Sequence, residues 1–266
     1  MTPIPQAHRA FFGVILLAAA VVAIGGLLVP NVLADVFSWF SLPPLHARFL
    51  GAIYLWGALF MIGCIRAQRM DEVQWALPLV SIFTGMLFVV SVLNLSAFDF
   101  GRTPVLIWFA SYVIYPLIGL VLFVRAPRPA PSSDGATPLP TWAQAYLLIQ
   151  GVIVTTLAAV LFVLPAQVAS AWPWPVTTFL AQAYSGPLLA YGIASLLYSR
   201  LHTWREVRSI VPGMLAFTAV TLVASIGHLA VFGTLDAIDY LWFAAFGAAT
   251  AALAVMTLRA TRTPTP

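Results

Sequence analysis

The chain has 266 residues, of which 62% are hydrophobic and only 8% are charged. A soluble domain carries about a quarter charged residues, so this composition excludes a water-soluble globule and predicts a membrane protein. The net charge is +4 and all twelve basic residues are arginines, which excludes a lysine Schiff base. The single Cys64 excludes a disulfide framework and a thiolate metal cluster.

Eight apolar segments predict eight transmembrane helices, because about 20 apolar residues cross the hydrocarbon layer of a bilayer. They lie near residues 10–29, 45–65, 75–97, 105–124, 146–164, 179–198, 210–232 and 240–258. The Pro- and Trp-containing stretches 31–44 and 166–178 are too short to span and predict interfacial connectors. Residues 129–141, rich in Pro, Ser and Gly, predict a cytoplasmic linker.

The two halves of the chain match each other at a shift of 134 residues (206 − 72). Without a gap, Glu72 aligns with Glu206, Pro78 with Pro212, Trp108 with Trp242 and Arg125 with Arg259. Before the middle of the second segment the shift is 135, as in Pro30 and Pro165. Polar and aromatic matches in one register indicate an internal duplication. The sequence therefore predicts an all-α polytopic membrane protein with two tandem four-helix repeats in the same orientation, residues 1–128 and 142–266.

The arginines predict the orientation in the membrane. With eight helices, ten of the twelve arginines lie on the side that holds both termini, and only Arg48 and Arg102 lie on the other. Cytoplasmic loops carry an excess of arginine and lysine. We therefore expect a multi-pass protein of the plasma (inner) membrane with both termini in the cytoplasm. Since each repeat has an even number of helices, both repeats should insert in the same sense.

Polar residues form a stripe on the third segment and on the seventh. The stripes consist of Thr84, Ser91 and Asn94, and of Thr218, Thr221, Ser225 and His228. Spacings of three and four residues place each stripe on one helix face. Because polar groups find no partners in lipid, both stripes should face protein or a shared cavity. His228 aligns with Asn94, and we expect this difference between the halves to serve a ligand.

A second group of polar residues is predicted at the outer ends of the helices. His46 and Arg48 open the second segment, and Asp99 and Asp236 follow the third and seventh. Arg48 aligns with the uncharged Ala183 at the shift of 135. Two alternatives remain open for Arg48: it extends to the headgroups, or it pairs with an aspartate to close a site. The candidate ligand-binding residues are His228, Asn94, Ser225, Ser91, Arg48, His46, Asp99 and Asp236.

The sequence contains no nucleotide-binding, metalloprotease or serine-hydrolase motif, and we expect no cofactor, metal or nucleic acid. The expected partners are the lipid bilayer and a small-molecule or lipid ligand. One hypothesis is a protein that binds or transports a small lipophilic or weakly anionic molecule between its repeats. The alternatives are a lipid-modifying enzyme with an outward-facing histidine, or a structural subunit. The enzyme hypothesis lacks a nucleophile with an adjacent base, and ion-coupled transport lacks an intramembrane carboxylate.

Overall fold

The structure, a computed structural model, describes residues 2–127 and 137–262, and within them it is all-α. The first half contains α1 (Gln6–Leu28), α2 (Pro30–Val36), α3 (Pro44–Arg66), η1 (Met70–Glu72), α4 (Ala76–Leu93), η2 (Leu95–Ala97) and α5 (Thr103–Val124). The second contains α6 (Thr141–Val163), α7 (Pro165–Ser170), α8 (Thr178–Tyr198), α9 (Trp204–Val207), α10 (Val211–Gly227), η3 (Leu229–Val231) and α11 (Ala237–Arg262). Of the predicted linker, residues 129–136 lie outside the described residues.

Six of the described helices are long and apolar enough to cross a membrane, so the chain is a polytopic membrane protein. They are α1, α3, α4 with the turn before it, α5, α6 and α11. The other two predicted spans, α8 and α10, are not among these six, and the reason differs between them. The helix α8 has 21 residues but is more polar, with Gln182 and Ser185 among them, and α10 is apolar but has only 17 residues.

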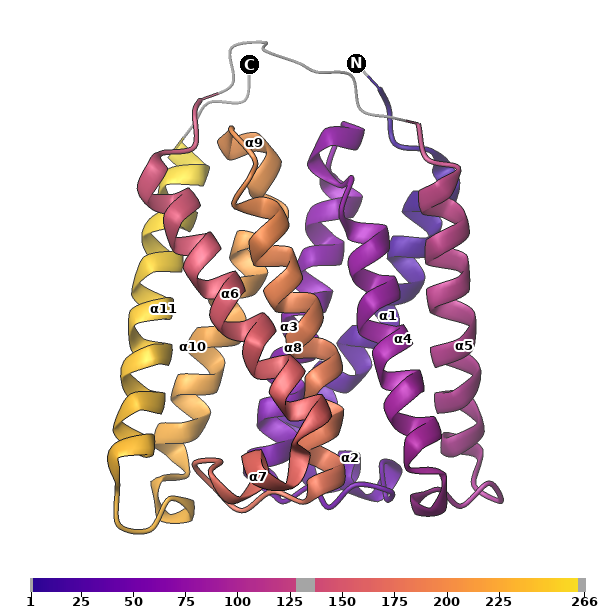
Figure 1. Ribbon diagram of the computed structural model, residues 1–266. Coiled ribbons are helices and arrows are strands. Elements are labelled where there is room, and N and C mark those ends of the chain that lie inside the picture. Colours follow the sequence, from indigo (N-terminus) through magenta and orange to yellow (C-terminus); the bar gives the residue numbers. More distant parts are fainter. Residues whose placement is uncertain (1, 128–136, 263–266) are drawn as a thin grey trace.

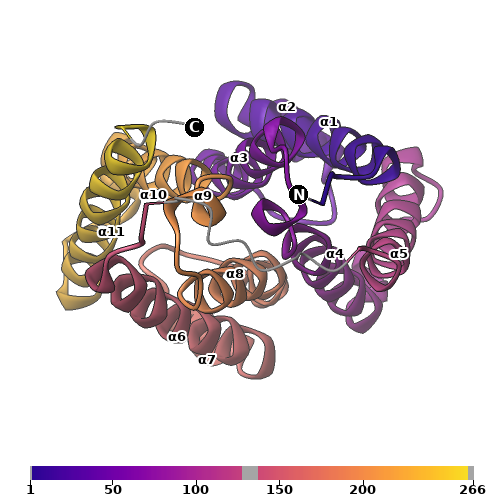
Figure 2. The same ribbon diagram turned by 90° about the horizontal axis from the view of Figure 1, so that it is seen from above.

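The helices α3, α4, α8 and α10 lie at the centre of the bundle, and α1, α5, α6 and α11 lie around them (Figure 1, Figure 2). The inner helices α3 and α10 pack against each other, as do α4 and α8, so both inner contacts join the first half of the chain to the second. The outer helices α1 and α6 pack on α3 and α8, and α5 and α11 pack on α4 and α10. In the outer helices most side chains face away from the protein, toward the space that lipid would occupy.

Small residues allow the outer helix α1 to lie directly on α3. A Cβ atom added to Gly26 would be 2.8 Å from the Cα of Gly51, and closer still to the carbonyl oxygen of Ala47. Such distances are too short for any side chain, so the two backbones touch here. Helices in lipid associate through small residues of this kind because no hydrophobic effect drives them together.

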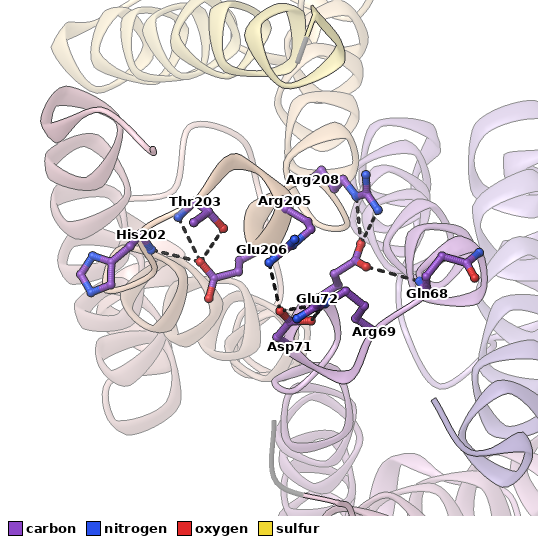
Figure 3. Close-up of polar contacts among 9 residues, drawn as sticks. All are labelled: Gln68, Arg69, Asp71, Glu72, His202, Thr203, Arg205, Glu206 and Arg208. Carbon is purple, nitrogen blue, oxygen red and sulfur yellow. Dashed lines mark hydrogen bonds and ion pairs between the residues drawn. The ribbon is translucent and has the colours of Figure 1, made fainter. Parts of the chain in front are cut away.

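A network of charged residues joins the two halves at the end of the bundle where α1 begins and α11 ends (Figure 1, Figure 3). Arg208 donates to the Oε2 of Glu72 from Nε at 2.9 Å and forms an ion pair with it from its terminal nitrogen at 2.6 Å. The Glu72 side chain is 1% exposed. Arg205 forms an ion pair with Asp71 at 3.5 Å. Asp71 also forms an ion pair with Arg69, at 3.1 Å. Charged loops of the two halves are therefore bonded to one another at this end.

Candidate functional site

Arg48 and His228 form a hydrogen bond between the inner helices α3 and α10. A terminal guanidinium nitrogen of Arg48 lies 2.8 Å from Nε2 of His228, and Nδ1 of His228 lies 2.9 Å from the carbonyl oxygen of Ala224. Arginine only donates, so Nε2 must accept and the proton of a neutral imidazole must sit on Nδ1. Among the described residues, no ion pair or hydrogen bond joins Arg48 to Asp99 or Asp236.

We expected His228 to lie inside a helix. It does not, because α10 ends at Gly227 and His228 is its C-cap. Its φ angle of −124° is outside the helical region, and its ring bonds back to the carbonyl of Ala224 four residues earlier. Asn94 likewise caps α4, with its amide 2.9 Å from the carbonyl of Val90. The polar side chains compete for the last helical carbonyls and so end both helices early.

Asn94 forms the corresponding bond on the opposite side of the bundle. Its amide donates to the side-chain carbonyl of Gln182 on α8 at 2.8 Å, and Gln182 donates in turn to the carbonyl of Phe162 at 3.1 Å. Gln182 on α8 thus bonds to the residue that caps α4, as Arg48 on α3 bonds to the residue that caps α10. Gln182 is not among the site residues predicted from the sequence, because the shift of 135 aligns Arg48 with Ala183 and only a shift of 134 would align it with Gln182.

His46 is buried and fully bonded within the protein. Its Nε2 lies 2.8 Å from the carbonyl oxygen of Pro175, so Nε2 carries the proton. Its Nδ1 then accepts from the hydroxyl of Tyr184 at 3.1 Å and from the indole of Trp174 at 3.3 Å. His46 thus ties the start of α3 to α8 and to the segment before it, and it does not share a site with His228 through any hydrogen bond described here.

The other stripe residues face protein rather than lipid. Five of the seven are buried, namely Thr84, Ser91, Thr218, Thr221 and Ser225, and Asn94 and His228 are half-buried. Ser91 accepts from Trp108 at 2.8 Å and Ser225 accepts from Trp242 at 3.1 Å. These two bonds fasten α4 to α5 and α10 to α11, so both serines hold neighbouring helices together.

The two aspartates of the predicted site form local turns. Asp99 accepts from the backbone of Gly101 at 2.9 Å. Asp236 accepts from Ile238 at 2.7 Å and from Asp239 at 3.1 Å, at the start of α11. A carboxylate at a helix start satisfies free backbone N–H groups. The structure thus brings Arg48 to His228 and Asn94 to Gln182, and it leaves the two aspartates in turns of their own.

An apolar cavity of about 400 Å³ lies elsewhere, among α1, α3, α4 and α5 of the first half. Its volume is within the range of small-molecule sites. Val21 of α1 and Ile107 of α5 line it and are 70% and 61% exposed, so it opens at the outer surface of the bundle. The helices α1 and α5 contact each other much less than either contacts its inner neighbour. The opening therefore faces the surrounding bilayer.

The polar groups on the wall of this cavity are uncharged. None of the described residues that line it is charged, and the hydroxyls come from Thr84, Ser111, Tyr115, Tyr54 and Tyr112. The last two, on α3 and α5, are buried and hydrogen-bonded to each other. Neither tyrosine is among the site residues predicted from the sequence. Comparison of the two halves contains a signal for them, because the shift of 135 aligns Tyr54 with Leu189 and the shift of 134 aligns Tyr112 with Phe246.

The described residues contain no group of three or more His, Cys, Asp or Glu side chains that could hold a metal ion. Comparison with protein-family models, with curated proteins and with solved structures finds no match for this chain. The class of this protein therefore follows from the helices themselves: it is an all-α, polytopic membrane protein.

Proposed function

We propose that the protein binds a small lipophilic molecule that enters from the bilayer into the cavity of the first half. The observation that supports this most directly is the apolar cavity of about 400 Å³ with an opening between exposed residues of α1 and α5. A molecule dissolved in the membrane would reach it without passing through water. Our sequence-based hypothesis placed the ligand between the two halves, and the cavity instead favours a site within one of them.

The lipid-modifying alternative receives less support. Its base would be His46 or His228, and both ring nitrogens of each histidine are bonded to the protein. A general base must instead reach the proton that it removes. We therefore favour binding over catalysis.

Filling the cavity tests this function. Gly57 lines the cavity, and a Cβ atom added to it would approach only the Ala19 Cβ, at 3.9 Å. We expect Gly57→Phe to fold and to weaken binding of the apolar quencher bromododecane about tenfold or more, because the ring occupies the space. Quenching of the cavity residues Trp56 and Trp108 in detergent micelles measures the binding.

Gly13→Phe is the matched control, since an added Cβ at Gly13 meets nothing within 4 Å and the residue does not line the cavity. It should leave quenching unchanged. Equal quenching in the wild-type protein and in both variants would contradict the proposed function, because the probe would then be reaching tryptophans at the lipid-facing surface only.

We further propose that the fold is a tandem duplication of eight spans, with both repeats in the same orientation. Equivalent contacts in the two halves support it. Arg9 donates to the carbonyl of Ala67 after α3, and Gln144 donates to that of Leu201 after α8. Isolated bridges join Pro3 to Arg69 and Pro138 to Thr203. Each residue of a first-half contact is 134 or 135 positions before its counterpart in the second-half contact: Pro3 before Pro138, Arg69 before Thr203, Arg9 before Gln144, and Ala67 before Leu201.

Both termini are proposed to be cytoplasmic in the plasma (inner) membrane, on the basis of the arginine distribution. Thr137 and Asp99 are both exposed. Thr137 accepts a hydrogen bond from the backbone of Trp204 at the start of α9, and Asp99 lies in the connection from α4 to α5, at the opposite end of the bundle from α9 (Figure 1). In a Cys64→Ala background, a membrane-impermeant maleimide should label Asp99→Cys on intact cells and should label Thr137→Cys only after lysis. The reverse pattern would show the opposite orientation.

A further inference from the structure

The cavity contains a pair of tyrosines whose hydrogen-bonding capacity is only partly used. Tyr54 and Tyr112 both line the cavity, both are 7% exposed, and their hydroxyl oxygens are hydrogen-bonded to each other. Two phenols carry two O–H donors between them. The mutual bond uses one, whichever tyrosine donates it.

The second O–H has no acceptor among the residues that the structure describes, since the mutual bond is the one hydrogen bond found for either hydroxyl. The other hydroxyls nearby do not supply one: Thr84 donates to the carbonyl of Val80 at 2.7 Å, and Tyr115 and Ser111 form no hydrogen bond with the pair. A buried donor without an acceptor is costly. An acceptor atom on a molecule bound in the cavity would satisfy this donor.

We propose that this donor binds the oxygen of a neutral carbonyl group on a lipophilic ligand. The inference rests on the proposed function and specifies its ligand. A carbonyl oxygen accepts a hydrogen bond without adding a donor of its own that would need a partner. A carboxylate or phosphate would be buried without a positive partner, because none of the lining residues described is charged. A pure hydrocarbon would leave the donor unsatisfied.

The second half of the chain carries no such pair at the aligned positions, which are Leu189 at the shift of 135 and Phe246 at the shift of 134. Phe246 instead packs against Trp242 and Phe217, with ring centroids 4.4 Å and 5.8 Å away. The hydroxyl pair therefore belongs to the first half alone, as a carbonyl-binding site in one cavity requires.

Two quenching probes in detergent micelles test the proposal: decylbenzoquinone, which has a neutral carbonyl, and bromododecane, which has none. The wild-type protein should bind decylbenzoquinone about tenfold more tightly, the value of one hydrogen bond to a buried donor. The double variant Tyr54→Phe with Tyr112→Phe should lose this preference and still bind bromododecane. Tyr54→Phe alone and Tyr112→Phe alone should each keep the preference for decylbenzoquinone, because one hydroxyl remains in the cavity. Tyr240→Phe is the control, since Tyr240 is 63% exposed on α11 and should not alter either affinity.

The carbonyl stretching band of bound decylbenzoquinone gives a second measurement that needs no variant. It should shift to lower frequency in the wild-type protein than in empty micelles, as hydrogen bonding to a carbonyl requires. An unshifted band, or a preference that survives in the double variant, would overturn the carbonyl proposal while bromododecane binding still supports the cavity. If Gly57→Phe affects neither probe, the proposed function and this inference both fail.

Discussion

Replacing Arg208 with alanine is expected to destabilise the folded protein by about 3 kcal/mol, the lower end of the cost of leaving a buried charge unpaired. The Glu72 side chain is 1% exposed in the wild-type protein, and the variant leaves its carboxylate without the Arg208 partner. One backbone bond, from Gln68 at 3.3 Å, would remain to that carboxylate. The Arg208 side chain is itself 35% exposed, which is why we expect the lower end. Reversible unfolding in mixed micelles measures the change.

Arg200 provides the control for that experiment because its side chain is exposed and it lies between α8 and α9, shortly before the helix that carries Arg205. Arg200→Ala should change the free energy of unfolding by less than about 0.5 kcal/mol. Adding Glu72→Gln to Arg208→Ala should restore part of the lost stability, because no charge is then left unpaired. An Arg208→Ala protein as stable as the wild type would mean that water solvates Glu72 fully at this end of the bundle.

Gly26→Ala is the second substitution with a large expected effect. Its new methyl group would lie 2.8 Å from the Cα of Gly51 and against the carbonyl of Ala47, so α1 must move away from α3. Overpacking costs about 1–3 kcal/mol, and here backbone atoms oppose the methyl group. We expect a net loss of about 2 kcal/mol in the free energy of unfolding, even after the gain in helix propensity.

Gly13→Ala, on the same helix, should have the opposite sign. Nothing lies within 4 Å of an added Cβ at Gly13, so the variant should gain up to about 1 kcal/mol from helix propensity alone. The same sign for Gly13→Ala and Gly26→Ala would contradict a close backbone contact between α1 and α3.

The apolar segments predicted from the sequence agree with the helices where lipid sets the limits. The predicted segment 45–65 corresponds to α3 (Pro44–Arg66), and 105–124 corresponds to α5 (Thr103–Val124). Hydrocarbon requires a continuous helix of fixed length, so composition alone determines these elements. The all-α, polytopic class follows from the same requirement.

The third and seventh predicted segments were too long because an apolar run does not reveal where a side chain takes over a helical carbonyl. Asn94 and His228 bond back to the carbonyls of Val90 and Ala224, and the helices end there. Both residues had been placed on the stripe by their spacing alone.

The cavity could not be predicted for a different reason. Its existence depends on how the outer helices α1 and α5 lean on α3 and α4, and lateral contacts of this kind leave no periodic pattern in the sequence. Tyr54 and Tyr112 lie 58 residues apart, and only their packing brings the two hydroxyls together.

The pairing of inner helices across the two halves has a consequence for synthesis at the ribosome. Arg48 and its partner His228 are separated by 180 residues. At a synthesis rate of about 5–20 residues per second, His228 is added to the chain roughly 10–40 seconds after Arg48. For much of that time, between the synthesis of α4 and that of α8, the helices α3 and α4 exist without their partners α10 and α8, so their unpaired faces are open to other helices. Before the second half is made, the faces of α3 and α4 that later pack on α10 and α8 would be accessible to an insertion chaperone or to a second nascent chain. In the folded protein these faces are covered.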